Sequence, residues 1–275
     1  IITVDRRLDS RRPRKWRVYG EFDCSNIYEK FCDAFSVWHK MCSVSCPKFD
    51  MTITDDQQNR LRELQTVFLE ENAKLNLSAI REPDAVWIGN ISDSVVALDL
   101  DIFQRSDLKI LDIGTGGGFP LLPLAICKPG CHFTGLDSTQ KKLDAITRMT
   151  NALDLTNVRM LAGRCEEKGR DSQHRDQYDI VTARAVAPLN ILLELGGPFV
   201  KPGGHLIAWK SMKMDTELEE SLLARANLSC HLVDTHEYEL PDDWGKRQLL
   251  IFEKTSSTDQ KYPRETGIPK KNPLL

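Results

Sequence analysis

The residues best suited to bind a cofactor lie in a glycine-rich segment that reads Leu-Asp-Ile-Gly-Thr-Gly-Gly-Gly-Phe over residues 111–119. It follows an apolar run at residues 108–113 and opens a helical pattern, which is the setting in which glycine loops hold ligands. Glycine lets the backbone turn tightly and approach a ligand closely. We therefore predict a cofactor loop, although a glycine-rich turn without a ligand has the same local pattern. Its predicted cofactor-binding residues are Gly114, Gly116, Gly118 and Phe119.

Two carboxylates decide between the cofactors that such a loop can hold. Asp112 precedes the first glycine by two residues, where it would repel a pyrophosphate but could hold a water or the cationic amino end of a methionine group. Asp137 ends the next apolar run, 25 residues further on, and there it could accept hydrogen bonds from two ribose hydroxyls. Enzymes that bind NAD also have a carboxylate at the position of Asp137, so this residue alone does not distinguish the two cofactors. The pair favours S-adenosylmethionine over a dinucleotide.

A third polar segment, Arg164-Cys165-Glu166, follows the next apolar run. Ligands of doubly wound sheets bind outside the carboxyl ends of the strands. When such a sheet binds S-adenosylmethionine, the loop after its third strand lies beside the adenine of the cofactor. We therefore predict that these three residues bind the cofactor. A polar surface loop is an equally good interpretation of the three residues taken alone.

Short apolar runs alternate with amphipathic helical patterns after residue 108. Such alternation is typical of a doubly wound α/β sheet with right-handed crossovers. The last two runs have no helix between them and are expected to pair antiparallel. The expected strands are 108–113, 131–136, 158–162, 178–183, 205–210, 229–239 and 247–254, and the expected helices are 120–127, 138–153, 189–195 and 215–226, with a turn region at 198–204.

The chain before the sheet has a different pattern. A capping box at Thr54–Gln57 and an apolar stripe behind it predict one helix, and residues 83–98 predict a second. The expected organisation is a poorly matched N-terminal extension at 1–50, a helical cap at 51–100, a Rossmann-like domain at 101–255 and a basic C-terminal tail at 256–275.

Composition sets broad limits on the class of protein. The 275 residues suit one larger domain with an appendage or two small domains, and 41% apolar residues allow a sizeable core. No run approaches the roughly 18 apolar residues of a membrane helix. The net charge of −3 argues mildly against a dedicated nucleic-acid binder, since such domains are usually strongly basic. A local basic face could still bind phosphates, because screening acts over about 10 Å.

Eight cysteines occur without a visible secretory signal, so reduced thiols are expected. Two pairs, Cys42 with Cys46 and Cys127 with Cys131, lack the spacing of a metal site, and no metal is predicted. The expected compartment is the cytoplasm. The Arg-rich start of the chain leaves the plastid stroma as an alternative if the source is a photosynthetic eukaryote.

Several segments, in one order along the chain from about residue 54, resemble a known family. The two most specific read Thr-Ala-Arg-Ala-Val at residues 182–186 and Tyr-Pro-Arg-Glu-Thr-Gly-Ile-Pro at residues 262–269. The others are the glycine-rich segment and residues 76–80, 93–94, 136–142, 157–158, 163–166, 178–187, 210 and 273–274. The chain resembles the RsmG (glucose-inhibited division protein B) family of bacterial guanine-N7 methyltransferases of 16S ribosomal RNA.

The resemblance implies a class I methyltransferase sheet with an N-terminal helical cap, and S-adenosylmethionine as methyl donor. It implies that the substrate is 16S-type ribosomal RNA presented on the small ribosomal subunit, and we expect a monomer. Carried over by position, the glycine loop would hold the cofactor and Asp137 its ribose. The residues predicted to meet the RNA are Asn76, Lys141, Arg184, Lys210, Arg247 and Arg264, while Arg164 is also basic in the family.

Arg184 is predicted to be the essential positioning residue, because it follows the fourth strand at the edge where such sheets bind ligands. Its planar fork could bind guanine O6 or a phosphate, and a surface salt bridge is the alternative. Guanine N7 has a lone pair and no proton, so its methylation needs alignment and no general base. One residue departs from the family: Asn90 stands where a His is typical, so any role that needs an imidazole is in doubt.

The basic tail, which carries Lys261, Arg264, Lys270 and Lys271, is expected either to grip ribosomal RNA phosphates or to pack loosely as a solvated segment. Three other functions stay open. The chain could methylate a small molecule or protein, could bind RNA or the ribosome with a vestigial cofactor pocket, or could be a dinucleotide oxidoreductase. The acid at Asp112 and the antiparallel last strands count against the last of these.

Overall fold

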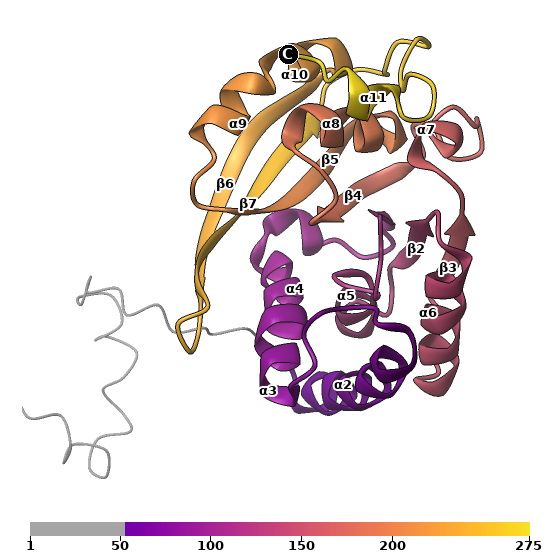
Figure 1. Cartoon of the computed structure of the whole chain (residues 1–275), viewed down its shortest axis with the longest axis vertical. Helices are drawn as coiled ribbons and strands as arrows, with labels where there is room; N and C mark the ends of the chain where they lie inside the picture. Colours follow the sequence, from indigo (N-terminus) through magenta and orange to yellow (C-terminus); the bar gives the residue numbers. More distant parts are fainter. Residues whose placement is uncertain (1–52) are drawn as a thin grey trace, which may run out of the picture. The chain divides into compact units, whose positions relative to one another are not determined.

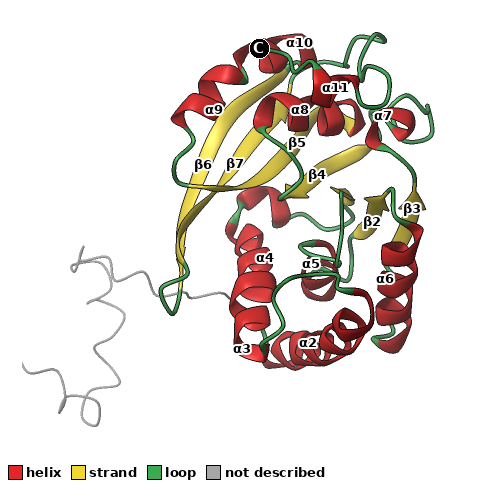
Figure 2. Ribbon diagram, viewed as in Figure 1, coloured by secondary structure: helices red, strands yellow, loops and turns green. Residues whose placement is uncertain are grey.

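The computed structural model describes residues 53–275, and its centre is a seven-stranded sheet (Figures 1 and 2). The predicted extension at 1–50 lies outside the described residues. Across the sheet the strand order is β3-β2-β1-β4-β5-β7-β6. The strands are β1 (Lys109–Ile113), β2 (His132–Asp137), β3 (Val158–Ala162), β4 (Tyr178–Arg184), β5 (Val200–Ser211), β6 (Cys230–Leu240) and β7 (Gly245–Lys254).

The sheet is parallel except at one strand. β1 pairs in parallel with β2 and β4, β2 with β3, and β4 with β5. β7 runs antiparallel to both of its neighbours, β5 and β6. Because the order reverses between β1 and β4, the first residues after these two strands meet at a switch point, where such sheets bind ligands. The predicted doubly wound sheet with an antiparallel last strand is confirmed.

Consecutive residues of the central strands point into two different cores. Ile110 packs with the helices on one face of the sheet, whereas Leu111 packs with those on the other. The same alternation separates Ile207 from Leu206, because successive side chains of a strand point to opposite faces. A sheet buried on both faces needs apolar residues at nearly every position, which is why these strands appear in the sequence as continuous apolar runs.

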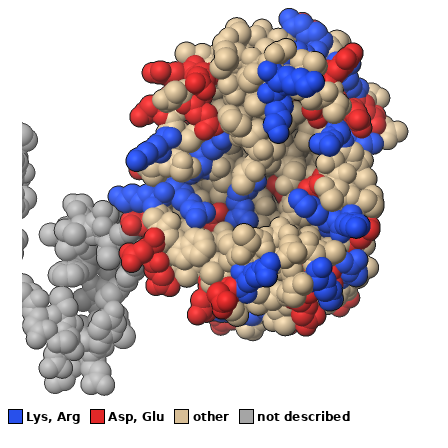
Figure 3. Space-filling model, in the orientation of Figure 1, with Lys and Arg blue, Asp and Glu red and all other residues tan. Residues whose placement is uncertain are grey.

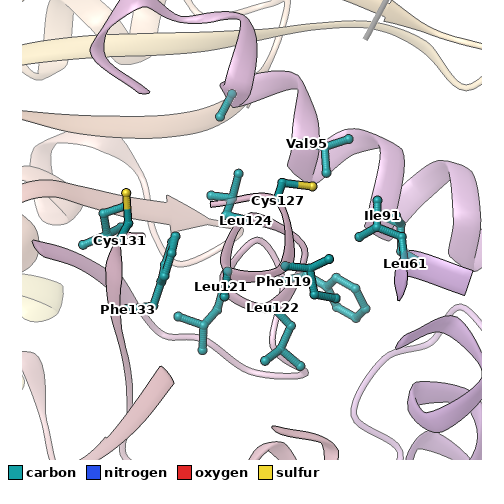
Figure 4. Packing of buried hydrophobic residues seen from close by; sticks show 14 of the residues in the cluster. Leu61, Ile91, Val95, Phe119, Leu121, Leu122, Leu124, Cys127, Cys131 and Phe133 are labelled. Atoms are coloured by element: carbon teal, nitrogen blue, oxygen red, sulfur yellow. The ribbon is translucent and has the colours of Figure 1, made fainter. Parts of the chain in front are cut away.

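The first face is covered by α2 (Asp55–Leu75), α5 (Leu121–Cys127), α6 (Gln140–Ala152) and the helical run 83–99. Figure 4 shows part of this core, with Leu61 of α2 and Leu124 of α5 among side chains of β2 and the helical run. The second face is covered chiefly by α8 (Leu189–Gly196) and α10 (Leu222–Leu228). The short helices α7 (Cys165–Lys168), α9 (Asp215–Glu220) and α11 (Ile268–Lys271) complete the described chain.

Helix α2 begins where the capping box predicts it. The Thr54 side chain accepts a hydrogen bond from the backbone N–H of Gln57, and the Gln57 side chain accepts one from Thr54 N–H. The expected second helix at 83–98 is a continuous helical run with a π-helical segment, Trp87–Ser92, in its middle. Gly89 lies in this segment, and a Cβ there would come within 2.3 Å of the Trp244 ring. Such π segments often mark functional sites.

The described sheet domain differs from the sequence prediction mainly at element ends. β5 begins at Val200, inside the predicted turn region, because Tyr178 and Gln177 pair with the chain as it leaves Phe199. The predicted helix 215–226 is divided into α9 and α10 at Ser221. No helix within residues 53–275 is long and apolar enough to cross a membrane.

Candidate cofactor and substrate site

The glycine loop after β1 turns in a backbone region that side chains rarely adopt. Gly114, Gly116 and Gly118 have φ values of 65°, 57° and 91°. At Gly114 a Cβ would also come within 3.0 Å of Val186, a residue of the loop after β4. Glycine is therefore favoured at this position for two reasons, the left-handed turn of the backbone and the close approach of the loop after β4. The loop stays open to a ligand at the carboxyl end of β1.

Asp137, at the end of β2, holds the glycine loop in place. Its Oδ2 accepts a hydrogen bond from Gly116 N at 3.1 Å, and its Oδ1 accepts one from Thr139 N at 2.8 Å. An ionised carboxylate has about four acceptor positions, so two backbone bonds leave room for two ribose hydroxyls. The sequence prediction for this residue thus has a geometry that suits it.

Asp112 is buried at the end of β1, with 1% of its surface exposed. Its Oδ1 accepts a hydrogen bond from Thr182 Oγ1 at 2.8 Å, while its Oδ2 has no protein partner. The buried hydroxyl of Thr115 makes no hydrogen bond either, but it lies near enough to Asp112 to lower the pKa of that carboxyl group. Burial raises the pKa of Asp112 to about 7. A buried acceptor without a partner costs about 1–3 kcal/mol, so this carboxyl group is suited to a ligand that brings a donor or a positive charge.

A pocket of about 470 Å³ opens beside Asp137 at this end of the sheet. Five of the predicted cofactor residues line it, namely Gly114, Asp137, Arg164, Cys165 and Glu166. Its apolar lining includes Leu136, Val186, Ile191, Leu195 and Pro269. Polar groups at one end and apolar side chains around them suit a nucleoside, which has a flat ring and a hydroxylated sugar.

The other predicted cofactor residues do not line this pocket. Asp112, Gly116 and Gly118 belong to the strand end and loop beside it. Phe119 is buried and packs edge-on against Phe68 of α2, with ring centroids 4.8 Å apart. Its ring therefore joins the glycine loop to the helices before the sheet.

Arg184, the last residue of β4, points into a buried polar cluster. Its Nη1 donates to Asp93 Oδ2 at 2.8 Å and to the Gly89 carbonyl at 3.0 Å, and its Nη2 donates to Asn90 Oδ1 at 3.0 Å. The guanidinium carbon is 5.7 Å from the centre of the Phe119 ring. Arg184 thus ties the π-helical segment to the carboxyl end of β4, next to the glycine loop.

Asp93 is the centre of this cluster and is fully buried. Its Oδ1 accepts a hydrogen bond from Tyr238 Oη at 2.7 Å and pairs with Arg247 Nη1 at 3.1 Å. Two guanidinium groups therefore share one carboxylate, and the cluster keeps a net positive charge. The Asn90 side-chain oxygen accepts a hydrogen bond from Arg184, while its amide nitrogen is buried without a partner.

Lys210 of β5 also points inward. Its ammonium donates to the Ala187 carbonyl at 3.0 Å and pairs with Glu217. Glu217 in turn accepts a hydrogen bond from Leu189 N at 2.6 Å. These bonds fix the loop between β4 and α8, in which Ala185 has a φ of 56°, a strained value for a residue with a side chain.

The remaining residues predicted to meet RNA have mixed placements. The backbone N–H of Arg264 forms one hydrogen bond to the buried carboxylate of Glu194 and its side chain forms three, the shortest at 2.6 Å. Asn76 ends α2, and its side chain accepts a hydrogen bond from Arg81. Lys141 is exposed on α6. The structure therefore brings Arg184 and Arg247 together at Asp93, and it places Arg264 elsewhere, against Glu194 of α8.

Sequence reasoning missed four residues of the C-terminal segment that line the same pocket. They are Thr266, Gly267, Pro269 and Lys270. The motif at 262–269 marks this segment as specific, but nothing in its residue types indicates a cofactor wall. The tail is therefore packed on the sheet domain, and it is not a solvated extension.

One face of the described domain is hollowed. Figure 3 shows the hollow across the middle of the drawn face, between the part that carries α8 and α9 and the part that carries α2 and the helical run 83–99. Lys and Arg side chains lie along it. This distribution gives a locally basic surface to a chain whose net charge is −3.

Comparison with known proteins agrees with this geometry. Ribosomal RNA small subunit methyltransferase G of Staphylococcus saprophyticus is 42% identical over 223 residues, which cover 81% of this chain and 92% of the relative. The Staphylococcus carnosus protein of that name is 40% identical, covering 82% and 94%. That of Streptococcus pyogenes is 39% identical, covering 81% and 94%.

Solved structures resemble the chain more distantly. A S-adenosylmethionine-dependent methyltransferase of Aquifex aeolicus gives a TM-score of 0.48 at 18% identity, covering 68% of this chain and 98% of that one. The family model described as rRNA small subunit methyltransferase G (GidB) matches residues 57–241, which include the glycine loop, Asp137 and Arg184. The chain belongs to the rRNA small subunit methyltransferase G family.

Proposed function

We propose that this protein transfers a methyl group from S-adenosylmethionine to N7 of a guanine in 16S ribosomal RNA. The observation that carries the proposal is the pocket lined by the glycine loop after β1, by the Asp137 carboxylate at the end of β2 and by the residues that follow β3 and β4. The Arg184 cluster does not line this pocket and lies beside it, where the Arg184 guanidinium approaches Phe119 of the glycine loop. Membership of the family supplies the class of substrate.

The residues present fit this cofactor. Asp137 has acceptor positions to spare for a ribose, and the pocket beside it has apolar walls for an adenine. The unpartnered Oδ2 of Asp112 suits the ammonium of the methionine end. A dinucleotide would bring a pyrophosphate toward this same carboxyl group, which counts against a nicotinamide cofactor.

The chemistry needs little from the protein beyond placement. When bound, S-adenosylmethionine supplies an electrophilic methyl group on a sulfonium. Guanine N7 has a lone pair and no proton in the neutral base, so the protein needs no general base to activate it. What it must do is align the two partners and exclude water, and alignment can lower a barrier by about 7–11 kcal/mol.

Arg184 contributes to that alignment through protein contacts. Both of its terminal nitrogens are engaged by Gly89, Asn90 and Asp93, so a planar fork to guanine would require these bonds to exchange. We propose instead that Arg184 holds the helical run 83–99 against the end of β4 and so shapes the acceptor side of the site. It is a positioning residue.

We further propose that the RNA is presented on the small ribosomal subunit, that the protein acts as a monomer and that it works in the cytoplasm, where bacterial ribosomes assemble. The hollow lined with Lys and Arg supports contact with a large anionic surface. A methyltransferase for a small molecule or protein, and a vestigial RNA binder, are less favoured, because the relatives carry the name of an rRNA methyltransferase over nearly their whole length.

The test is methyl transfer from labelled S-adenosylmethionine to 30S subunits that lack the modification, followed by nuclease digestion of the RNA. Label in 7-methylguanosine of 16S RNA is the expected result, and it should be lost in Arg184→Ala. Subunits that already carry the modification serve as the control. Cofactor binding without label on any RNA would exclude the proposed substrate.

A further inference from the structure

We infer that the C-terminal segment Thr266–Lys270 is one wall of the cofactor pocket and that Lys270 is a binding residue for the nucleoside of S-adenosylmethionine. This inference rests on the proposed function. It gives the C-terminal tail a role in binding the cofactor, although the basic residues of the tail suggest a role in binding RNA.

The segment is anchored beside the pocket at two points. The backbone N–H of Gly267 donates to Glu166 Oε1 at 3.0 Å, and this glutamate lies in α7, which follows β3 and lines the pocket. Just before it, Arg264 binds Glu194 of α8, whose carboxylate is fully buried. A charged pair with one buried member holds its geometry well, because separating it would leave that charge without a partner.

A second group of contacts fixes the chain that leads to the wall. The buried guanidinium of Arg175 donates to three carbonyls of the tail, those of Thr258, Asp259 and Tyr262. Arg170 donates to the carbonyl of Pro263 at 2.8 Å. The residues up to 264 are therefore held without help from the last ten residues, which allows the wall to be removed separately.

The pocket beside this wall is the nucleoside end of the site. It is lined by Asp137 and by Arg164 and Glu166, whereas Asp112, the residue suited to the methionine ammonium, does not line it. Adenine presents ring nitrogens that accept hydrogen bonds and one amino group that donates. The pocket offers matching groups: the guanidinium of Arg164 and the ammonium of Lys270 can donate, and the Glu166 carboxylate can accept.

The two adjacent lysines of the tail differ in a way that the test can use. Lys270 lines the pocket, whereas Lys271 does not, and both are exposed. Among residues 53–275 neither has an ion-pair partner. If the tail served RNA through its charge alone, the two would be equivalent, since phosphate binding depends chiefly on the number of cations.

The experiment measures binding of S-adenosylmethionine, and of 5′-methylthioadenosine, which keeps the nucleoside and lacks the amino acid, by calorimetry without RNA. In Lys270→Ala we expect the Kd for both ligands to rise about fivefold, as for loss of one ordinary hydrogen bond, because Lys270 is exposed and its charge is screened by water. The matched variant Lys271→Ala should bind like the unchanged protein. Deletion of residues 266–275, which keeps Arg264 and Tyr262, should raise both Kd values about tenfold or more.

Binding of a 16S RNA fragment, measured over a range of salt concentrations, tests the alternative that the two lysines bind RNA and not the cofactor. The inference is overturned if both lysine variants bind the two ligands normally and weaken RNA binding equally. Should the deletion fail to fold, as judged by its thermal transition, the two lysine variants still decide the question. Failure of the unchanged protein to bind S-adenosylmethionine would instead refute the proposed function.

Discussion

The affinity for S-adenosylmethionine should depend on pH through Asp112. Burial raises the pKa of this carboxyl group to about 7, and its Oδ2 has no protein partner. A ligand ammonium beside it favours the ionised form. With a pKa of about 7, roughly a tenth of the groups are ionised at pH 6 and roughly three quarters at pH 7.5, so affinity should rise roughly eightfold between them. The ligand's own amino group, with an ordinary pKa of about 7.7–8.0, has already lost roughly a third of its protons at pH 7.5, which reduces the expected rise to about five- to sixfold.

Asp112 should also make the stability of the folded protein depend on pH, but in the opposite direction: affinity rises with pH, whereas stability falls. The pKa of an ordinary aspartate is 3.8, so between pH 4 and pH 7 the folded protein keeps a proton that the unfolded chain has released. This contribution to the free energy of unfolding is fully present below pH 4 and is lost as the pH rises to about 7. The linkage amounts to roughly 4 kcal/mol. Asp112→Asn, which has no such proton, should make the unliganded protein more stable at pH 8 and flatten this dependence.

Calorimetric titrations with S-adenosylmethionine at pH 6, 6.5, 7 and 7.5 and constant ionic strength would check the affinity, and denaturant unfolding of the unliganded protein between pH 4 and pH 8 would check the stability. Asp112→Asn should bind more weakly and without pH dependence, and 5′-methylthioadenosine should bind the unchanged protein equally at each pH. Asp137→Asn is the matched control, since it should weaken binding at every pH and keep the slope. The reasoning is refuted if the slope survives in Asp112→Asn or is absent from the unchanged protein.

Two further substitutions probe the helical run beside Arg184. Gly89→Ala should destabilise the protein by about 1–3 kcal/mol through overpacking, because its Cβ would meet the Trp244 ring at 2.3 Å, whereas Gly130→Ala, with open space around it, should leave the melting temperature nearly unchanged. Equal melting temperatures of Gly89→Ala and the unchanged protein would show that the Trp244 ring moves aside, which would contradict this expectation. Arg184→Lys keeps the charge beside Asp93 but loses the planar fork that makes three hydrogen bonds. It should lower kcat for 30S methylation at least about tenfold while the Kd for the cofactor changes less than about twofold, and a change confined to that Kd would contradict its positioning role.

The sheet could be predicted from sequence because its determinants are local. A strand buried on both faces requires a continuous apolar run, and a helix start requires a cap such as Thr54 within three residues of its partner. The glycine loop and Asp137 belong to the same class, since a turn and a strand end are fixed by neighbours along the chain. These features depend on period and spacing, which a sequence displays directly.

The partners of the basic residues could not be predicted, because they are distant in the chain. Arg184 and Asp93 are 91 residues apart, and Gly267 and Glu166 are 101 residues apart. A basic residue at the ligand-binding edge of a sheet has the same sequence context whether its side chain contacts RNA or a buried carboxylate. The sequence placed Arg184 at the end of the fourth strand and left open contact with RNA or a surface salt bridge, whereas in the structure Arg184 pairs with the buried Asp93.

A chain of net charge −3 can still present a locally basic surface, because its acids and bases are unevenly placed. The carboxylates of Asp93 and Glu194 are buried, so each one neutralises an arginine inside the domain. Asp93 serves two arginines at once, and the charge of the second, Arg247, stays partly exposed. Because screening limits charge effects to about 10 Å, RNA that enters the hollow responds to this local excess of cations and not to acids elsewhere on the surface. Net charge is therefore a poor guide to nucleic-acid binding when, as here, acids and bases are unevenly placed.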